Sequence, residues 1–281
     1  GFTPISEQYK TDPQGLTSLI NRFLTPMTDL IMGRDGTIDK YMGDCIMAFW
    51  NAPVNVKGHE VKAVESALGM VHRLKELNDE LESEGLMPIK IGIGINTGEV
   101  VVGNMGSNNR FDYSILGDAA NLASRLEGQS KGYGVTIILG EETAHAVEEE
   151  LYCIELDKIA VKGKEDAIRI FTVLGKTDWV FHNTNWFALD QQHDKFLQFY
   201  RGQKWSFAEK WATDLRDAWP DMEDYYNIML SRIEEYKENS PGENFPTQLL
   251  GESLDTGEPQ TAGPWSAVPL GSETQEILLL Q

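Results

Sequence analysis

The stretch IDKYMGDCIMAFW at residues 38–50 decides the fold class of this chain. It contains two short runs of strand-forming residues, 38–42 and 45–50, separated by Gly43 and Asp44. Two residues of this kind between two such runs are typical of a tight β-hairpin. A carboxylate beside a glycine at the tip is suited to hold Mg²⁺ on a phosphate, because glycine lets a ligand approach closely. An ordinary surface turn would carry the same residues, so the pattern alone leaves both interpretations open.

Helical patterns lie on both sides of this hairpin. Apolar residues recur at intervals of three and four over 16–31 and 59–81, which predicts two amphipathic helices. Isoleucines then alternate with other residues over 89–96, which predicts a strand. One side of that strand is bare at Gly92 and Gly94, so we expect something to pack close to its backbone.

The pattern of strands and helices continues to about residue 176. Further strands are predicted at 110–116, 135–139, 152–159 and 168–173, and further helices at 118–127 and 141–150. Strands that alternate with helices, with hairpins among them, indicate a two-layer α/β sandwich.

The composition excludes several classes of protein. Of the 281 residues, 24 are basic and 44 acidic, and the net charge of −20 argues against general binding of nucleic acid. Cys45 and Cys153 are the only cysteines, and both lie in apolar runs, so we expect two buried free thiols in a reducing compartment. The sequence has no run of 18 apolar residues, so it predicts no membrane span, and no signal peptide is recognisable.

The chain divides into three parts by composition. Residues 1–176 form the predicted α/β domain, 177–240 an aromatic-rich helical extension, and 241–281 a tail rich in Pro, Gly, Ser, Thr and Glu. The segment 196–208 weakly resembles a tetratricopeptide helix-turn-helix repeat, but a single repeat cannot bury its own apolar face. We therefore expect a helical cap docked on the α/β domain or on a partner, followed by a disordered tail.

Two further segments carry side chains suited to nucleotide chemistry. Asn121 and Arg125 are four residues apart on a predicted helix, so they share one face. An amide beside a guanidinium suits a ribose and a phosphate undergoing substitution, although an exposed helix could carry the same pair. Lys162 and Lys164 flank Gly163 in a predicted turn, which becomes informative only if a triphosphate lies nearby.

Taken together, these segments resemble the class III nucleotide cyclases, the family of adenylate and guanylate cyclases. The matching segments are, in chain order, GFT at 1–3, KYMGD at 40–44, NTGEVVVGNMGS at 96–107, RFDYSILGDAANLASRLEG at 110–128 and VKGK at 161–164. The resemblance implies the ferredoxin-like α/β catalytic domain of that family. We expect it to be truncated at its first strand, because the chain opens inside the first motif.

The resemblance also implies a metal site. In this family two carboxylates bind two Mg²⁺ or Mn²⁺ ions that activate the ribose 3′-hydroxyl and hold the triphosphate. Asp44 matches the second carboxylate, and the first would lie just upstream of Gly1. Because both anions are needed, we expect this fragment to be inactive or nearly so. Backbone N–H groups of Gly1, Phe2 and Thr3 are implied to bind phosphates.

The purine-selecting positions of the family are Lys40 and Ser114 in this chain. Adenylate cyclases carry Lys with Asp, Thr or Ser at these positions, whereas guanylate cyclases usually carry Glu and Cys. A lysine donates to adenine N1, and a serine oxygen accepts from the exocyclic amine. Guanine would turn an N1–H donor toward the lysine. The resemblance therefore implies ATP as the substrate.

Other roles follow from the resemblance in the same way. Asn121 is implied to orient the ribose, Arg125 to stabilise charge on the α-phosphate, and Lys162 to bind the terminal phosphates. The family's active site lies at a two-fold interface, which implies a homodimer with two equivalent sites. The implied function is the conversion of ATP to cyclic AMP for intracellular signalling. We expect a cytoplasmic domain of a parent anchored in the plasma membrane, as in bacterial cyclases with a similar helical extension.

The sequence leaves two other functions to compare with this one. A non-catalytic cyclase-homology module for dimerisation and regulation is favoured by the absent first carboxylate, but it would be expected to lose several of the other functional side chains. A palm-type polymerase or diguanylate cyclase should carry a GG[DE][DE][FY]-like turn, whereas this chain has MGDC at 42–45.

Overall fold

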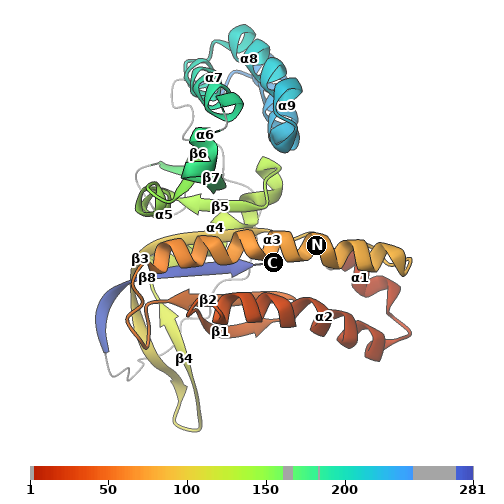
Figure 1. Ribbon diagram of the computed structural model, residues 1–281, viewed down its shortest axis with the longest axis vertical. Helices are drawn as coiled ribbons and strands as arrows, with labels where there is room; N and C mark the ends of the chain where they lie inside the picture. The colour runs from red at the N-terminus through yellow and green to blue at the C-terminus, as the bar shows by residue number, and fades with distance from the viewer. Residues whose placement is uncertain (1–2, 161–166, 183, 243–269, 281) are drawn as a thin grey trace. The chain divides into compact units, whose positions relative to one another are not determined.

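The computed structural model describes residues 3–160, 167–182, 184–242 and 270–280 (Figure 1). The chain forms two compact units. Unit 1 comprises Gly1–Gly128 together with Pro264–Gln281, and unit 2 comprises Gln129–Gly263.

A mixed-length antiparallel sheet is the centre of unit 1. Its strands are β1 (Thr37–Met42), β2 (Cys45–Trp50), β3 (Ile93–Ser107), β4 (Arg110–Leu116) and β8 (Leu270–Leu280). Strands β1, β2, β8 and β3 are neighbours in that order, and β4 pairs with β3. The structure confirms the predicted hairpin between β1 and β2.

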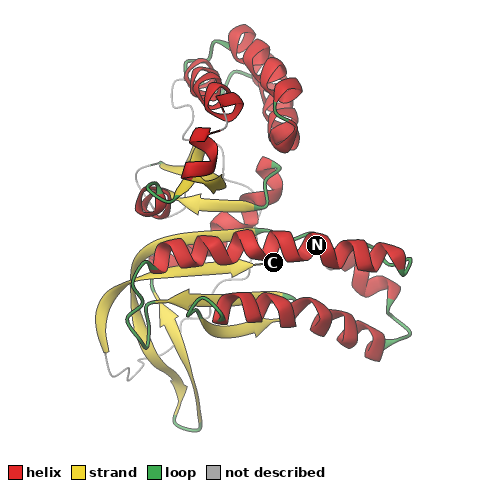
Figure 2. Cartoon of the chain, in the orientation of Figure 1, coloured by secondary structure: helices red, strands yellow, loops and turns green. Residues whose placement is uncertain are grey.

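Two long helices cover one face of this sheet. After the short α1 (Thr3–Gln8), α2 (Pro13–Met32) and α3 (His59–Ser83) confirm the two predicted amphipathic helices. The Asp12 carboxylate caps α2 by accepting a hydrogen bond of 2.9 Å from the backbone N–H of Gly15. Helix α3 lies against β2, β3 and β8, and α2 packs beside it (Figure 2).

The other face of the sheet packs against α4 (Asp118–Tyr133). The first half of α4 contributes Ala120 and Ala123 to a buried cluster that contains Phe49 of β2 and Ile277 of β8. Alternate strand residues point to opposite faces, so a strand buried on both faces reads as a continuous apolar run. This explains why β2, whose residues are nearly all buried, has the sequence CIMAFW.

Strand β8 contradicts the predicted disorder of the tail. Residues 270–280 form a strand hydrogen-bonded to β2 on one side and β3 on the other. The overall composition of 241–281 hid the short apolar run 277–280, and within it Ile277 and Leu278 are fully buried. The disorder prediction was therefore wrong for this segment.

Strand β3 also differs from its prediction. It begins at Ile93 rather than at Ile89, and it continues through the glycine-rich stretch 96–106 to Ser107. Glycine weakens a strand, but here β4 and β8 pair with β3 and replace the lost side-chain packing with ladder hydrogen bonds.

Unit 2 combines a small sheet with the helical extension. Its elements are β5 (Ile137–Gly140), α5 (Glu141–Val147), β6 (Leu151–Ile159), β7 (Ile168–Lys176), α6 (Thr177–His182), α7 (Thr184–Arg201), α8 (Trp205–Ala218), the 3₁₀ turn η1 (Pro220–Met222) and α9 (Glu223–Glu238). Strands β5 and β6 both pair antiparallel with β7.

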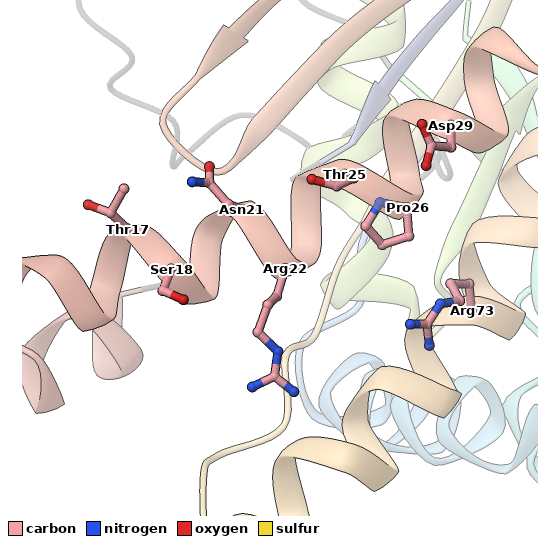
Figure 3. Close-up of a pocket in the computed structure, with 8 residues that line it drawn as sticks. All are labelled: Thr17, Ser18, Asn21, Arg22, Thr25, Pro26, Asp29 and Arg73. Carbon is pink, nitrogen blue, oxygen red and sulfur yellow. The ribbon is translucent and has the colours of Figure 1, made fainter.

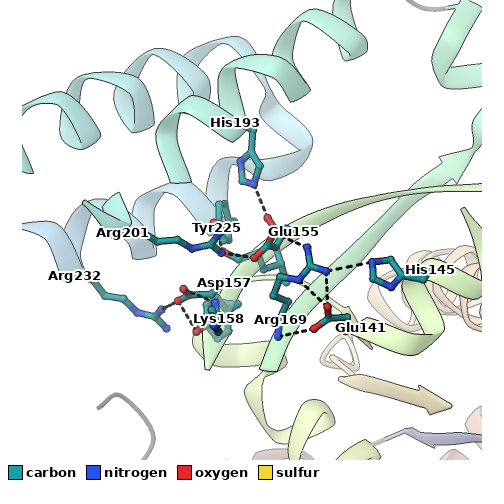
Figure 4. Close-up of polar contacts among 12 residues, drawn as sticks. Glu141, His145, Glu155, Asp157, Lys158, Arg169, His193, Arg201, Tyr225 and Arg232 are labelled. Carbon is teal, nitrogen blue, oxygen red and sulfur yellow. Dashed lines mark hydrogen bonds and ion pairs between the residues drawn. The ribbon is translucent and has the colours of Figure 1, made fainter. Parts of the chain in front are cut away.

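A buried histidine joins α7 to the sheet of unit 2 (Figure 4). His193 is fully buried, and its Nε2–H donates to the Glu155 carbonyl oxygen at 2.6 Å. Its Nδ1 lies 2.9 Å from the Tyr226 hydroxyl of α9. Burial lowers the pKa of His193 to about 4, and the nearby Arg201 guanidinium contributes to the decrease. The neutral ring therefore links β6, α7 and α9.

A second buried group, Asp157, joins α9 to the same strand. Its carboxylate accepts from the Tyr133 hydroxyl at 2.8 Å and lies 3.5 Å from the Arg232 guanidinium. Tyr225 of α9 donates to the Leu156 carbonyl oxygen at 2.7 Å. Because these polar contacts are buried, the helical extension is part of the core of unit 2 rather than a separate repeat module.

Both cysteines are free thiols, as predicted, although Cys153 is only half-buried. No helix in the part of the chain that the structure describes is long and apolar enough to cross a bilayer.

Candidate functional site

A β-bulge in β1 places two charged residues on the same face. Ile38 pairs with Ala48 and Lys40 pairs with Met47, which leaves Asp39 as the extra residue. In a bulge two residues oppose one on the partner strand, and the usual alternation of side chains is interrupted. Asp39 and Lys40 can therefore both turn toward β4.

Three side chains meet at this bulge. Lys40 Nζ lies 3.5 Å from Ser114 Oγ of β4. The Ser114 hydroxyl donates a hydrogen bond of 2.7 Å to Asp39 Oδ2, and Lys40 Nζ is 3.3 Å from Asp39 Oδ1. Lys40 and Ser114, predicted from the sequence as a pair, are thus brought together, and Asp39 touches both.

Exposure differs sharply within this cluster. The Lys40 side chain is 45% exposed, whereas the Asp39 side chain is 0% exposed. Ser114 is buried on β4, which lies beside β1 of the hairpin. The Lys40 side chain is therefore accessible to a ligand, while the buried aspartate contacts both Lys40 and Ser114.

Asp44 lies at the tip of the hairpin, as the sequence predicts. Gly43 has φ of +67°, a value that favours glycine at the first central position of a two-residue hairpin turn. A Cβ atom at Gly43 would meet nothing within 4 Å, so the tip is open above the half-buried Asp44. Burial raises the pKa of Glu127 on α4 to about 7, and the negative charge of Asp44 contributes to this increase.

Helix α4 presents Asn121 and Arg125 on one exposed face, as predicted from their spacing. The glycines of β3 set the position of this helix. A Cβ atom at Gly94 would lie 2.2 Å from the Ala123 carbonyl oxygen, and one at Gly98 would lie 2.7 Å from the Ala119 Cβ. The predicted close packing against the bare side of this strand is confirmed at Gly94, where the neighbouring atoms belong to the backbone of α4.

Three of the residues implied to bind phosphates lie outside the described part of the chain. They are Gly1, Phe2 and Lys162. Thr3 begins α1, but the description covers only its backbone.

The described residues fit the implied pair of divalent ions only in part. Asp44 supplies a carboxylate, the type of oxygen ligand that Mg²⁺ and Mn²⁺ prefer. Within the described ranges, however, no group of three His, Cys, Asp or Glu side chains could hold a metal ion. One of the two expected carboxylates is present.

Asp39 is a site residue that the sequence did not predict. An acidic residue beside a lysine in a strand resembles a solvated surface pair, and nothing in the local pattern indicates the bulge. The bulge becomes visible only in the pairing register of β1 with β2.

A pocket of about 710 Å³ lies elsewhere in unit 1, along α2 and beside α3 (Figure 3). Its basic residues are already paired. Arg22 donates to the Glu84 carboxylate at 2.7 and 2.9 Å, and Arg73 donates to Glu76 and Glu80 at 3.4 and 3.3 Å. An anion would have to displace these carboxylates, so this pocket is a poor candidate for a phosphate site.

Comparison with known proteins identifies the larger part of the chain. The family model for the adenylate and guanylate cyclase catalytic domain matches residues 1–175. An adenylate cyclase of Anabaena cylindrica is 38% identical over 184 residues, which cover 62% of this chain and 34% of that protein. The chain spans about a third or less of the length of the curated relatives that it matches.

Two solved structures share the fold. The adenylyl cyclase CyaB from P. aeruginosa is 34% identical, with a TM-score of 0.57, and the match covers 62% of this chain and 88% of that one. The guanylyl cyclase Cya2 is 33% identical, with a TM-score of 0.55, and the match covers 63% of this chain and 88% of that one. The α/β fold implied by the resemblance is thereby confirmed.

Proposed function

Because the chain belongs to the class III nucleotide cyclases, the family of adenylate and guanylate cyclase catalytic domains, we propose that it acts in an adenylate cyclase. The reaction converts ATP to 3′,5′-cyclic AMP and diphosphate. The observation that carries this proposal is the contact of 3.5 Å between Lys40 Nζ and Ser114 Oγ. The matching proteins include both adenylyl and guanylyl cyclases, so the choice of base rests on these two side chains.

The pair offers a donor and an acceptor side by side. A lysine ammonium only donates, which suits adenine N1, and a serine oxygen accepts from the exocyclic amine. Guanine has an N1–H at the position of the acceptor, and this N1–H would face the ammonium without forming a hydrogen bond. An unpaired donor in a binding site is costly, so ATP is favoured over GTP.

The ribose and phosphates would be held from α4 and from the loops. Asn121 orients the ribose, and Arg125 stabilises the negative charge that grows on the α-phosphate during attack by the 3′-hydroxyl. Lys162 and the backbone at Phe2 and Thr3 hold the terminal phosphates. The exposed face shared by Asn121 and Arg125 supports this assignment, since both must reach a ligand outside the domain core.

We assign Asp44 to metal binding. Bound Mg²⁺ or Mn²⁺ ions would supply charge neutralisation on the phosphates and acidify the 3′-hydroxyl. The second carboxylate would come from the strand that precedes the Gly-Phe-Thr motif in the family. We also propose a homodimer, in which metal ligands of one protomer face Lys40, Ser114, Asn121 and Arg125 of its partner.

The test uses a version of the chain that also carries the family's first strand and its aspartate ahead of Gly1. This protein is incubated with ATP or GTP and Mn²⁺, and the cyclic nucleotide formed is measured. We expect cyclic AMP from ATP. Asp44→Ala should lower the rate by about 10²–10³ or more, in the range seen when one preorganised charge is removed. Asp79→Ala, at an exposed position on α3, is the matched control and should retain the activity.

The alternative function is a non-catalytic dimerisation and regulatory module, and the same assay tests it. Failure of the extended chain to form either cyclic nucleotide, in a preparation shown by sedimentation to be folded and dimeric, would favour this module over the enzyme.

A further inference from the structure

Asp39 has no role in the reaction described above, yet its environment is unusual for an aspartate. Its side chain is completely buried on β1, in a chain whose other acidic residues are mostly exposed. Its Oδ1 atom is buried and receives no hydrogen bond from any residue that the structure describes. Burying a carboxylate costs free energy unless the charge is paired, so its position requires a compensating interaction.

Two contacts provide this compensation, and both are with the base-recognition pair. An ionised carboxylate can only accept hydrogen bonds, so in the contact of 2.7 Å the Ser114 hydroxyl must be the donor. The single hydroxyl hydrogen is then directed inward to Asp39. What Ser114 presents to a ligand is its lone pairs, so it acts as an acceptor only.

Lys40 is held by the same carboxylate. Its ammonium lies 3.3 Å from Asp39 Oδ1 and 3.5 Å from Ser114 Oγ, although nearly half of this long side chain is exposed. An unrestrained lysine would sample many rotamers, and fixing it costs entropy on binding. The buried charge holds the ammonium next to the serine before any ligand arrives.

We propose that Asp39 is a positioning residue that sets the adenine preference of the Lys40–Ser114 pair. It directs the hydroxyl hydrogen of Ser114 away from the ligand and holds the ammonium of Lys40 beside it. The pair then presents a donor to adenine N1 and an acceptor to the 6-amine. This inference rests on the proposed function, because it assumes that a purine nucleotide meets these two side chains.

A purely structural role for Asp39 predicts a different result. If the carboxylate only stabilised the bulge or balanced the lysine charge, its loss would lower the affinity for all purine nucleotides equally or leave every affinity unchanged. If it sets the direction of the hydroxyl, its loss must change how the affinity depends on the substituent at the 6-position of the purine. Base analogues that differ only at that edge therefore distinguish the two roles.

The experiment measures competition against a fluorescent ATP analogue on the full 281-residue chain with Mn²⁺. The competitors are ATP, purine riboside triphosphate, which lacks the 6-amine, and ITP, which has a 6-oxo group and an N1–H. The unsubstituted chain should bind ATP about tenfold more tightly than either analogue, the value of one hydrogen bond. Asp39→Asn removes the charge at nearly constant volume, and the freed hydroxyl can donate as well as accept. The preference for ATP over ITP should then fall severalfold, because the freed hydroxyl can donate to the 6-oxo group. The preference over purine riboside triphosphate should persist, because the hydroxyl still accepts from the 6-amine.

Two controls separate folding and charge from positioning. Asp79→Asn removes one negative charge from an exposed position on α3 and should leave the three affinities unchanged. In a Ser114→Ala background, Asp39→Asn should add no further loss at the 6-position, because the hydroxyl through which it acts is gone. Circular dichroism and the thermal midpoint of each variant verify folding.

Each outcome decides one question. A preference for ATP over ITP that is unchanged in folded Asp39→Asn overturns the positioning role and leaves the proposed function standing. An equal loss for all three nucleotides also overturns it, in favour of a structural role. If the unsubstituted chain binds no nucleotide, or binds ATP and ITP equally, the proposed function fails and the inference fails with it.

Discussion

Asp39 and Lys40 carry opposite charges on the same face of β1, and this pairing limits how the base preference can be redesigned. In the family, guanylate cyclases usually carry Glu and Cys where this chain has Lys40 and Ser114. A glutamate at position 40 would lie against the buried carboxylate of Asp39, at the place where an ammonium now lies 3.3 Å away. Like charges at this separation repel, and burial strengthens the repulsion.

We therefore expect the double variant Lys40→Glu/Ser114→Cys to be destabilised and to bind GTP poorly. Adding Asp39→Asn should remove the repulsion. The triple variant should therefore have a higher thermal midpoint than the double variant and bind GTP about tenfold more tightly. Thermal midpoints and competition with a fluorescent GTP analogue measure both effects. A double variant that is as stable as the triple variant would contradict this account of Asp39.

The sequence predicted Lys40 and Ser114 as a pair because both match motifs of a known family. It could not predict Asp39, because whether neighbouring strand residues share a face depends on a bulge. The bulge is a property of the register between two strands, and residues 37–42 contain no glycine or proline to indicate it.

At the scale of elements, the position of α4 depends on close contact with the glycines of β3. Gly94→Ala would place a methyl group 2.2 Å from the Ala123 carbonyl oxygen and 2.4 Å from the Glu127 backbone nitrogen. Both are backbone atoms, so α4 must move as a whole. We expect a loss of roughly 1–3 kcal/mol in the free energy of unfolding, measured in urea. Nucleotide affinity should fall as well, because Asn121 and Arg125 move with the helix.

Gly132→Ala is the matched control on the same helix. The nearest atom to an added Cβ there is 3.8 Å away, so the methyl group fits without displacing anything. Alanine favours the helix over glycine by about 0.5–1 kcal/mol, so this variant should be equally stable or more stable. Equal losses at both positions would show that the packing of α4 on β3 does not control the position of the helix.

Helices and strands were predicted correctly where the hydrophobic periodicity is strong. They were missed where pairing between distant segments stabilises the strand. The helices α2 and α3 and the β1–β2 hairpin followed from local patterns. Strand β8 and the glycine-rich part of β3 did not, because each is stabilised by the other and they lie far apart in sequence. Local propensity contains no information on such pairing.

At the scale of the whole molecule, the α/β domain predicted for 1–176 and the compact units of the structure divide the chain at different places. The observed division falls within α4, at Gly128, and it places β5, β6 and β7 with the helical extension. The buried contacts of His193 and Asp157 give the reason, since they connect this small sheet to α7 and α9. A boundary set by buried polar contacts between distant segments cannot be read from composition.

The same contacts predict how unit 2 responds to acid. The pKa of His193 is about 4 in the folded chain, below its usual value of 6.5, so between these values the unfolded state binds a proton that the folded state excludes. This stabilisation is fully present above pH 6.5 and is lost as the pH falls toward 4. The lost free energy of unfolding is on the order of 3 kcal/mol.

His193→Gln should weaken this response, because glutamine does not titrate. The free energy of unfolding in urea is measured at pH 7 and pH 4.5 for the variant and for the unsubstituted chain. The amount by which the change with pH differs between the two proteins is the contribution of His193. His72→Gln is the control at an exposed position on α3 and should leave the response unchanged. If the two substitutions alter the pH response equally, His193 is not the group that titrates.

The place of β8 also determines when unit 1 can fold during synthesis. Ile95 of β3 pairs with Leu278 of β8, and all of unit 2 is encoded between them. At typical translation rates of about 5–20 residues per second, β8 leaves the ribosome roughly 10–40 s after β3. During that interval β2 and β3 each have an unpaired edge that can join another strand. Unit 2 can fold first, so the helical extension is complete before the sheet of unit 1 is closed.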